Sequence, residues 1–378
     1  MTLEIRQACL GDYPAIAVFI VEAYGALAPY KGQDRWRWQF VDNPFATRSG
    51  DRVPVWIALD GTRVVGQIAV QPTEIKTVDE VRPAGWIVDV VVLPSFRGGG
   101  VGQQLYKAIA EQVPILITLT MAPATRRMAE RLAAITLPAV YQFSRWRRLN
   151  GQLVRRYLAM RTARRPRWHS LAELGDRAGF GNLFSALVNP FLSARDSRSQ
   201  VATRGQTEFV EVERFGAEID HLWQRIQSDY TFAVPRNSEF LNWRFCDCPR
   251  MSYRRFVAQR DGRTVGYVVL RRTESVELPH GIIVDVVFER PAIGILSEIF
   301  NFSIDWFGDT VGSIEFGTSI PEVAALVRDL GFFRTRTLHP TIVCADPDLR
   351  RLFSDPKNTW LLSKVDHDWD QIHLASLV

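Results

Sequence analysis

The sequence has few residues that could build a disulfide framework or a metal centre. Only four cysteines occur in 378 residues, and no C-x-x-C motif or paired zinc-ligand spacing includes them. The six histidines are scattered without the spacing of metal ligands. We therefore expect reduced cysteines and no metal site. The four cysteines are Cys9, Cys246, Cys248 and Cys344.

Long hydrophobic runs are also missing. The apolar stretch 86–93 is interrupted by Asp89 and is far shorter than the roughly 20 residues of a membrane helix. Charges stand within the first six residues, where a secretory signal would have an apolar run to follow. With 47% hydrophobic and 23% charged residues, the composition is that of a globular protein, so we expect a cytoplasmic chain without a transmembrane span.

Acidic residues are absent from one basic segment. Nine arginines lie between Arg145 and Arg167 with no Asp or Glu among them. This segment suits a solvated connector, a basic amphipathic helix on an anionic membrane, or a contact with a phosphorylated acceptor or other phosphates. Nucleic acid is disfavoured as a partner because no groove-reading motif accompanies the charge.

What the sequence does contain is an internal repeat. Three blocks recur in the same order, at offsets of 205, 201 and 196 residues. They are a Trp-rich block (36–40 and 242–245), an Asp-Gly turn (60–61 and 261–262) and an Ile-Val-Asp-Val-Val strand (87–91 and 283–287). Strand-like runs precede amphipathic helical patterns in both halves, so the fold class is α/β (α+β) with two similar units.

The repeat suggests how the chain divides. A length prior of roughly 150 residues per domain also favours two or three units. We expect a first domain over 1–144, a basic linker or helical segment over 145–205, and a second domain over 206–378. The polar stretch 193–205 is the expected linker, and the acidic stretch 366–370 is expected to be a solvated terminal turn.

The most specific local motif is a glycine segment between a buried strand and an amphipathic helix. Its residues Arg97-Gly98-Gly99-Gly100-Val101-Gly102 offer backbone amides without Cβ obstruction at a helix N-terminus, which suits a pyrophosphate. The alternative is an ordinary flexible turn that binds no phosphate. The segment is neither a P-loop nor a dinucleotide fingerprint in its usual place.

This segment resembles the acyl-CoA signature of the GNAT superfamily of N-acetyltransferases, [Gln/Arg]-x-x-Gly-x-[Gly/Ala]. The resemblance covers residues 3 to about 135 and implies tandem GNAT-like domains, each a mixed central sheet flanked by helices. In the second half the signature fails over 289–294, which has one glycine and a proline. The resemblance implies one acetyl-CoA site. Its phosphates would contact Arg97, Gly98, Gly99, Gly100, Val101, Gly102 and Gln103, and its thioester arm Val90, Val91 and Val92.

The resemblance further implies direct attack of an amine on the thioester, assisted by a base and an acid. Asp89 is the one carboxylate on the central strand and is the candidate base, although Asp285 at the repeat position favours a structural role. Relatives place a tyrosine in the last motif helix where this chain has Ala129, so Tyr141 is the candidate acid, or else a packed aromatic. Trp36 and Trp38 are candidates for acceptor contact, or for core packing.

The function expected from these residues is N-acetyl transfer from acetyl-CoA to a primary amine of a small or sugar-type acceptor. Two alternatives stay open: a tandem acyl or aminoacyl transferase acting on a cell-envelope precursor, and a non-catalytic acyl-CoA sensor. Nothing in the sequence indicates the acceptor, the acyl chain length or the oligomeric state.

Overall fold

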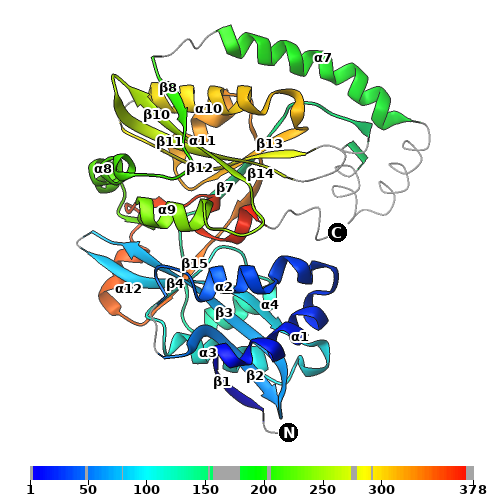
Figure 1. Ribbon diagram of the computed structural model, residues 1–378, viewed down its shortest axis with the longest axis vertical. Coiled ribbons are helices and arrows are strands. Elements are labelled where there is room, and N and C mark those ends of the chain that lie inside the picture. Colours follow the sequence, from blue (N-terminus) through cyan, green and yellow to red (C-terminus); the bar gives the residue numbers. More distant parts are fainter. Residues whose placement is uncertain are drawn as a thin grey trace.

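Two lobes, each built on a mixed sheet, make up the computed structural model of the protein (Figure 1). The structure describes residues 3–46, 50–78, 80–151, 154–155, 179–201, 206–273, 279–290 and 293–371. The lower lobe in Figure 1 holds the N-terminal elements and the upper lobe holds most of the later ones. The two-domain α/β fold expected from the repeat is thus confirmed.

The first sheet has the order β1-β2-β3-β4-β5-β15-β6, with β9 and β16 attached to β3. Its strands are β1 (Glu4–Cys9), β2 (Arg52–Asp60), β3 (Arg63–Lys76), β4 (Val81–Val92), β5 (Ile115–Thr118), β6 (Ile135–Thr136), β15 (Thr341–Cys344), β9 (Phe232–Ala233) and β16 (Trp360–Leu361). Its helices are α1 (Tyr13–Tyr24), α2 (Gln33–Phe40), α3 (Val101–Ala110), α4 (Pro123–Arg131) and α12 (Pro347–Ser354), together with the 3-10 helix η2 (Gly25–Lys31).

The second sheet has the equivalent order, β8-β10-β11-β12-β13-β7-β14. Asp261 and Gly262, in the turn between β10 and β11, both have positive φ, as a type I′ hairpin turn requires. The strands are β8 (Glu208–Glu211), β10 (Tyr253–Arg260), β11 (Arg263–Arg272), β12 (His280–Phe288), β13 (Ser313–Thr318), β7 (Val140–Trp146) and β14 (Phe333–Leu338). The helices are α8 (Ala217–Ile226), α9 (Ser238–Phe245), α10 (Ile293–Phe307) and α11 (Pro321–Asp329).

Strands β7 and β15 each join the sheet of the other domain. β7 follows β6 in the chain but lies between β13 and β14 of the second sheet, where Phe143 is opposite Phe316. In return, β15 lies between β5 and β6 of the first sheet, where Ile342 is opposite Ile117. The boundary expected at residue 144 therefore falls inside a strand of the second sheet, and neither sheet is made from one continuous segment.

Helix α7 (Phe180–Val201) lies along the outer side of the upper lobe (Figure 1). It extends to residue 201, so most of the stretch expected to be a linker is helical. Phe184, Val188 and Leu192 on one side of α7 pack with Leu149 and Val154. Most of the basic segment, residues 156–167, lies outside the described residues, as do residues 202–205.

Two arginines at the start of the basic segment are buried rather than solvated. Arg145 donates from Nε to the Leu330 carbonyl at 2.8 Å, and Arg147 donates from Nε to the Gly308 carbonyl at 3.1 Å. These two side chains stabilise the second domain, so they cannot serve a membrane or an acceptor.

In the described part of the chain, one helical stretch, Leu10–Lys31, is long and apolar enough to cross a membrane by length and composition. It is not a single α-helix, because α1 ends at Tyr24 and Gly25 has a φ of 54°. The 12 residues of α1 span about 18 Å, against a hydrocarbon thickness of about 30 Å. Ile16, Phe19 and Ile20 on its inner side belong to the first core.

Candidate active site

The glycine segment forms a tight turn that leads into α3. Gly98 and Gly100 have φ values of 86° and 79°, a region that L side chains rarely adopt, and Gly100 is the N-cap of α3. A Cβ on Gly102 would lie 3.3 Å from the Met128 sulfur of α4. The three consecutive glycines are solvent-exposed. Arg97 closes the start of the segment, donating from Nε to the Val92 carbonyl at 2.9 Å.

The amides of this turn are available to a ligand. Among the described residues, no backbone acceptor is recorded for the amides of Gly98, Gly99 or Gly100. The first amides of α3 are free as well, because the first turn of any helix lacks intrahelical acceptors. Converging amides at a positive helix end suit a pyrophosphate, so the residues present fit the phosphates of an acyl-CoA.

The strand that leads to the glycine segment separates from its neighbour. β4 pairs with β5 only at Gly85 and Trp86, so the β5 side of β4 is open from Ile87 onward. The register between β3 and β4 shifts next to Asp89, whose φ of 54° marks a bulge. Val90, Val91 and Val92, predicted to contact the thioester arm, lie half-buried along this opening.

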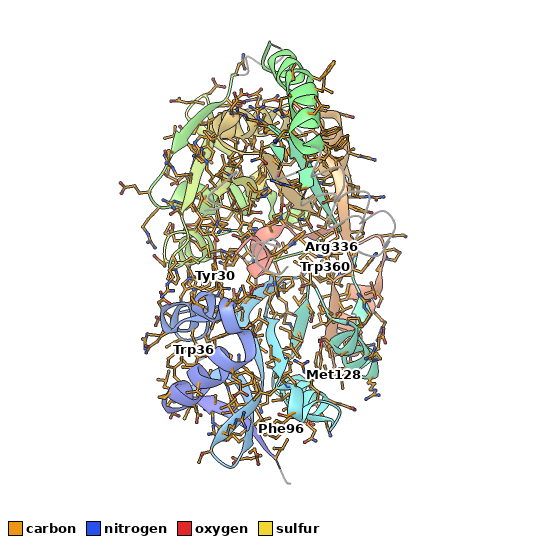
Figure 2. The ribbon with its side chains drawn as sticks, turned by 90° about the vertical axis from the view of Figure 1, so that its right-hand side faces the viewer. Tyr30, Trp36, Phe96, Met128, Arg336 and Trp360 are labelled. Atoms are coloured by element: carbon orange, nitrogen blue, oxygen red, sulfur yellow. The ribbon has the colours of Figure 1, made fainter. Side chains whose placement is uncertain are left out.

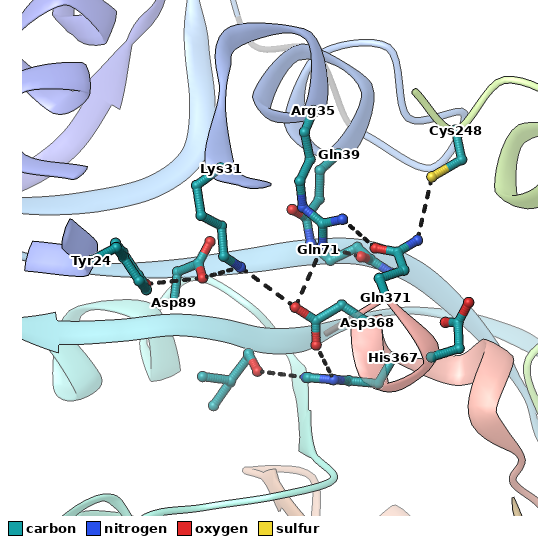
Figure 3. A network of polar contacts seen from close by, with 12 residues as sticks. Tyr24, Lys31, Arg35, Gln39, Gln71, Asp89, Cys248, His367, Asp368 and Gln371 are labelled. Atoms are coloured by element: carbon teal, nitrogen blue, oxygen red, sulfur yellow. Dashed lines mark hydrogen bonds and ion pairs between the residues drawn. The ribbon is translucent and has the colours of Figure 1, made fainter. Parts of the chain in front are cut away.

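Asp89 belongs to a buried polar network (Figure 3). Lys31 Nζ lies 2.6 Å from Asp89 Oδ1, and the Tyr24 hydroxyl donates to the same oxygen at 3.0 Å. Lys31 also lies 3.5 Å from Oδ2 of Asp368, whose Oδ1 is 2.6 Å from Nδ1 of His367. Both recorded partners of Asp89 contact Oδ1, so among the described residues Oδ2 remains available.

Burial and neighbouring charges fix the protonation states in this network. Burial, reinforced by Asp89, raises the pKa of Tyr24 well above its usual range, so the hydroxyl stays protonated. Burial opposes the charged form of Asp368, but His367, Lys31 and Arg35 hold its pKa well below the usual range. Burial likewise opposes the imidazolium of His367, but the Asp368 carboxylate raises its pKa above the usual value.

The second domain contains the equivalent network in sealed form. Arg236, 205 residues after Lys31, lies 3.1 Å from Asp285 and 2.7 Å from Asp366. Asp285 also accepts from the hydroxyls of Tyr267 and Ser363. Side-chain exposure is 0–1% for this triad, against 8–9% for Lys31, Asp89 and Asp368. Asp285 is therefore structural, and only the first network lies within reach of a ligand.

The other predicted site residues lie elsewhere. Tyr141 is a strand residue of β7, opposite Thr318 and Thr337, with the Arg334 guanidinium 5.7 Å from its ring centre. No hydrogen bond or ion pair within the described ranges joins it to Asp89. Its position in a strand of the second sheet favours the packed aromatic, and its role as the acid stays a prediction.

Both candidate tryptophans are packed into cores. Trp36 lies inside the first lobe, 4.9 Å from the Tyr13 ring (Figure 2). Trp38 stacks on Trp243 at 4.7 Å, and each indole NH donates to the other's backbone carbonyl. Trp38 and Trp243 thus join the domains at their repeat positions. The burial of Trp36 and Trp38 favours core packing over acceptor contact.

Sequence reasoning missed four residues of the network. Extending the repeat upstream would have aligned Lys31 with Arg236. No sequence pattern pointed to Tyr24. His367 and Asp368 lie in the terminal turn expected to be solvated, but the structure buries that turn between the domains. Its short 3-10 helices are η6 (Lys364–Asp366) and η7 (Asp368–Asp370).

Comparison with known proteins identifies the fold. The family model described as acetyltransferase (GNAT) family matches residues 17–132. No curated protein matches the chain. The family match is confined to the first domain.

Solved structures resemble the whole chain. A GCN5-related N-acetyltransferase from Kribbella flavida has a TM-score of 0.58 and 12% identity over 90% of this chain and 71% of that one. A tandem GNAT protein from the clavulanic acid biosynthesis pathway has a TM-score of 0.52 and 14% identity over 92% and 99%. Saccharomyces cerevisiae N-myristoyltransferase with bound myristoyl-CoA has a TM-score of 0.53 and 10% identity over 90% and 82%. The chain thus shares the fold of a tandem GNAT protein, as predicted.

Proposed function

We propose that the protein is a cytoplasmic N-acyltransferase that transfers an acetyl group from acetyl-CoA to a primary amine of a small or sugar-type acceptor. The observation that carries this proposal is the glycine segment, whose unpaired amides directly follow the open edge of β4. The second domain has no such segment, so the proposal includes one acyl-CoA site per chain.

Each part of the site has a role in this proposal. Acetyl-CoA supplies an acyl group activated as a thioester. The amides of Gly98 to Gln103 bind its phosphates, with Arg97 closing the segment. The open backbone of Val90 to Val92 offers hydrogen-bonding groups to its amide arm. Asp89 lies at the bulge where the acceptor amine would approach.

Asp89 is the proposed proton acceptor. Its Oδ2 would take the proton that the ammonium of the acceptor must lose before the nitrogen can attack. Lys31 pairs with Oδ1 of this carboxylate, and the protonated Tyr24 hydroxyl donates to the same oxygen, so together they fix its orientation. Lys31 and Tyr24 are therefore positioning residues.

The test is a calorimetric titration with CoA. We expect one site per chain, and we expect Gly100→Glu to abolish binding, since a side chain at positive φ and a negative charge would both enter the phosphate site. Gly262→Glu, at an exposed glycine of similar φ in a turn of the second domain, is the matched control and should bind CoA normally. Two equivalent sites, or unchanged affinity in folded Gly100→Glu, would reject this assignment.

A non-catalytic acyl-CoA sensor is the second candidate. It is favoured by Ala129, which stands where relatives place a tyrosine acid and is fully packed into the first core. Incubation with acetyl-CoA and a panel of amino sugars and polyamines separates the two, because only the enzyme releases free CoA thiol in an amine-dependent way.

A further inference from the structure

The opening between β4 and β5 ends at a closed apex. The last residue of β4 that pairs with β5 is Trp86, opposite Ile117. The next carbonyl, that of Ile87, accepts a hydrogen bond from Nε2 of His367 at 3.3 Å. The His367 ring also meets Trp86 edge-on, with ring centres 5.9 Å apart. A residue from the far end of the chain therefore fills the space directly beyond the last strand pair.

His367 is held rigidly in this place. Its Nδ1 faces the Asp368 carboxylate, which is anchored by Lys31 and lies 3.5 Å from Arg35. Its backbone carbonyl accepts from Arg244 of the second domain at 3.2 Å. Moving the ring out of the apex would break a buried ion pair, which is costly. The His367 ring is thus a fixed wall at the apex and does not move aside for a ligand.

This wall leaves little length for an acyl group. The bulge at Asp89 is two positions along the strand from the capped carbonyl of Ile87, about 7 Å at the usual rise. We propose that His367 sets the acyl-chain length of the site, so that acetyl and similarly short acyl groups are accepted and long fatty acyl chains are excluded. This inference rests on the proposed function, because it concerns the same acyl-CoA site.

The second domain supports this assignment of the terminal turn. There, β12 separates from β13 beyond Ile283, and the same turn fills the opening: Ser363 bridges to Thr318 of β13 and donates to Asp285 of β12 at 2.7 Å. The turn therefore seals the second opening completely and caps only the apex of the first. The part of the first opening that remains begins at the bulge and leads to the glycine segment.

The test compares affinities for acetyl-CoA and octanoyl-CoA by calorimetry, with unacylated CoA as the reference. The parent protein should bind acetyl-CoA more tightly than octanoyl-CoA. In His367→Ala the ratio of octanoyl-CoA to acetyl-CoA affinity should rise at least tenfold, because the vacated apex can bury methylene groups. His367→Asn, which puts a short side-chain amide in place of the imidazole ring, should shift the ratio in the same direction.

Two matched variants serve as controls. Ser363→Ala shortens a side chain of the same turn that contacts the second domain. It should leave the ratio of octanoyl-CoA to acetyl-CoA affinity unchanged. His367→Gln, closer to histidine in volume, should stay nearer the parent than His367→Ala does.

The outcomes distinguish this inference from the proposed function. If unacylated CoA does not bind the parent, the acyl-CoA site itself is wrong. If CoA binds but the parent prefers octanoyl-CoA, or if folded His367→Ala and His367→Asn both keep the parental ratio, His367 does not set the chain length.

Discussion

At the scale of single residues, two aspartates at equivalent repeat positions have different fates. Asp89 and Asp285 occupy the same Ile-Val-Asp-Val-Val block. Each pairs with a basic residue, which in turn contacts a carboxylate of the terminal turn. Both oxygens of Asp285 have partners, whereas the recorded partners of Asp89 share one oxygen. The sequence places an aspartate on this strand in both halves but could not assign its role. That role depends on how far the distant terminal turn covers each aspartate.

Asp89→Asn tests the catalytic role. We expect turnover, measured as amine-dependent release of CoA thiol, to fall by roughly a hundredfold, because the amide cannot accept the proton. CoA affinity should be kept, since the glycine segment is untouched, and Lys31 still has Asp368 as a partner.

The equivalent substitution Asp285→Asn provides the comparison. It should lower thermal stability strongly, because Arg236 would lose one of its two buried carboxylates. If Asp89→Asn behaves in the same way, losing stability while the folded protein keeps its turnover, Asp89 is structural too.

At the scale of elements, the repeat predicted most strands and helices but not the strand exchange. The periodicity of a short strand such as β7 or β15 shows which side chains face a core, not which sheet the strand joins. Which sheet each strand joins depends on the path of the chain around β6 and β14. Local sequence patterns do not encode that path. The stretch 193–205, expected to be a linker, is helical as far as residue 201 for a related reason: it continues a helix whose apolar contacts lie earlier, at Phe184 and Val188.

The helices α2 and α9 meet through the reciprocal pair of Trp38 and Trp243. Replacing either by Phe should cost about 1 kcal/mol in the free energy of unfolding, because one buried hydrogen bond is lost while the aromatic packing is largely kept. Urea unfolding measures this cost, and the double variant reports the coupling between the two residues.

Trp36→Phe is the matched control. Trp36 is as buried as Trp38, both being 4% exposed, but no acceptor for its indole NH is recorded within the described residues. The loss of that NH should therefore cost less than it does at Trp38 or Trp243. Equal costs at all three positions would show that packing, rather than the reciprocal hydrogen bonds, joins the helices.

At the scale of the whole molecule, the terminal turn fastens the two domains together. Its carboxylates pair with cations from both sides, Asp368 with Lys31 of the first domain and Asp366 and Asp370 with Arg236 and Arg244 of the second. An acidic stretch near the end of a sequence reads as solvated because its counter-charges are more than a hundred residues away. The compensation of charge, which makes burial possible, is visible only in the fold.

The outer side of α7 exposes a row of apolar side chains, which the packing of a globular fold alone does not explain. Phe180, Leu183, Leu187 and Phe191 follow one helical stripe and are 48–77% exposed. The arginines at 155–167 come before this helix in the sequence, with twelve residues between Arg167 and Phe180. An exposed apolar stripe that follows a basic segment in the sequence is suited to an anionic bilayer, where each arginine adds on the order of 1 kcal/mol.

We therefore expect the protein to sediment with vesicles containing phosphatidylglycerol, to do so less as salt rises, and not to sediment with neutral phosphatidylcholine vesicles. Binding should be lost in Leu183→Gln/Leu187→Gln and when Arg155, Arg156, Arg164 and Arg165 are all changed to Gln. The control is Val18→Gln/Val21→Gln, which changes two equally exposed apolar residues on α1 and should bind normally. Normal vesicle binding by the arginine variant with a raised acceptor KM would assign the arginines to a phosphorylated acceptor instead. A change from dimer to monomer in the α7 variant, seen by light scattering, would mean that a second copy of the chain covers the stripe.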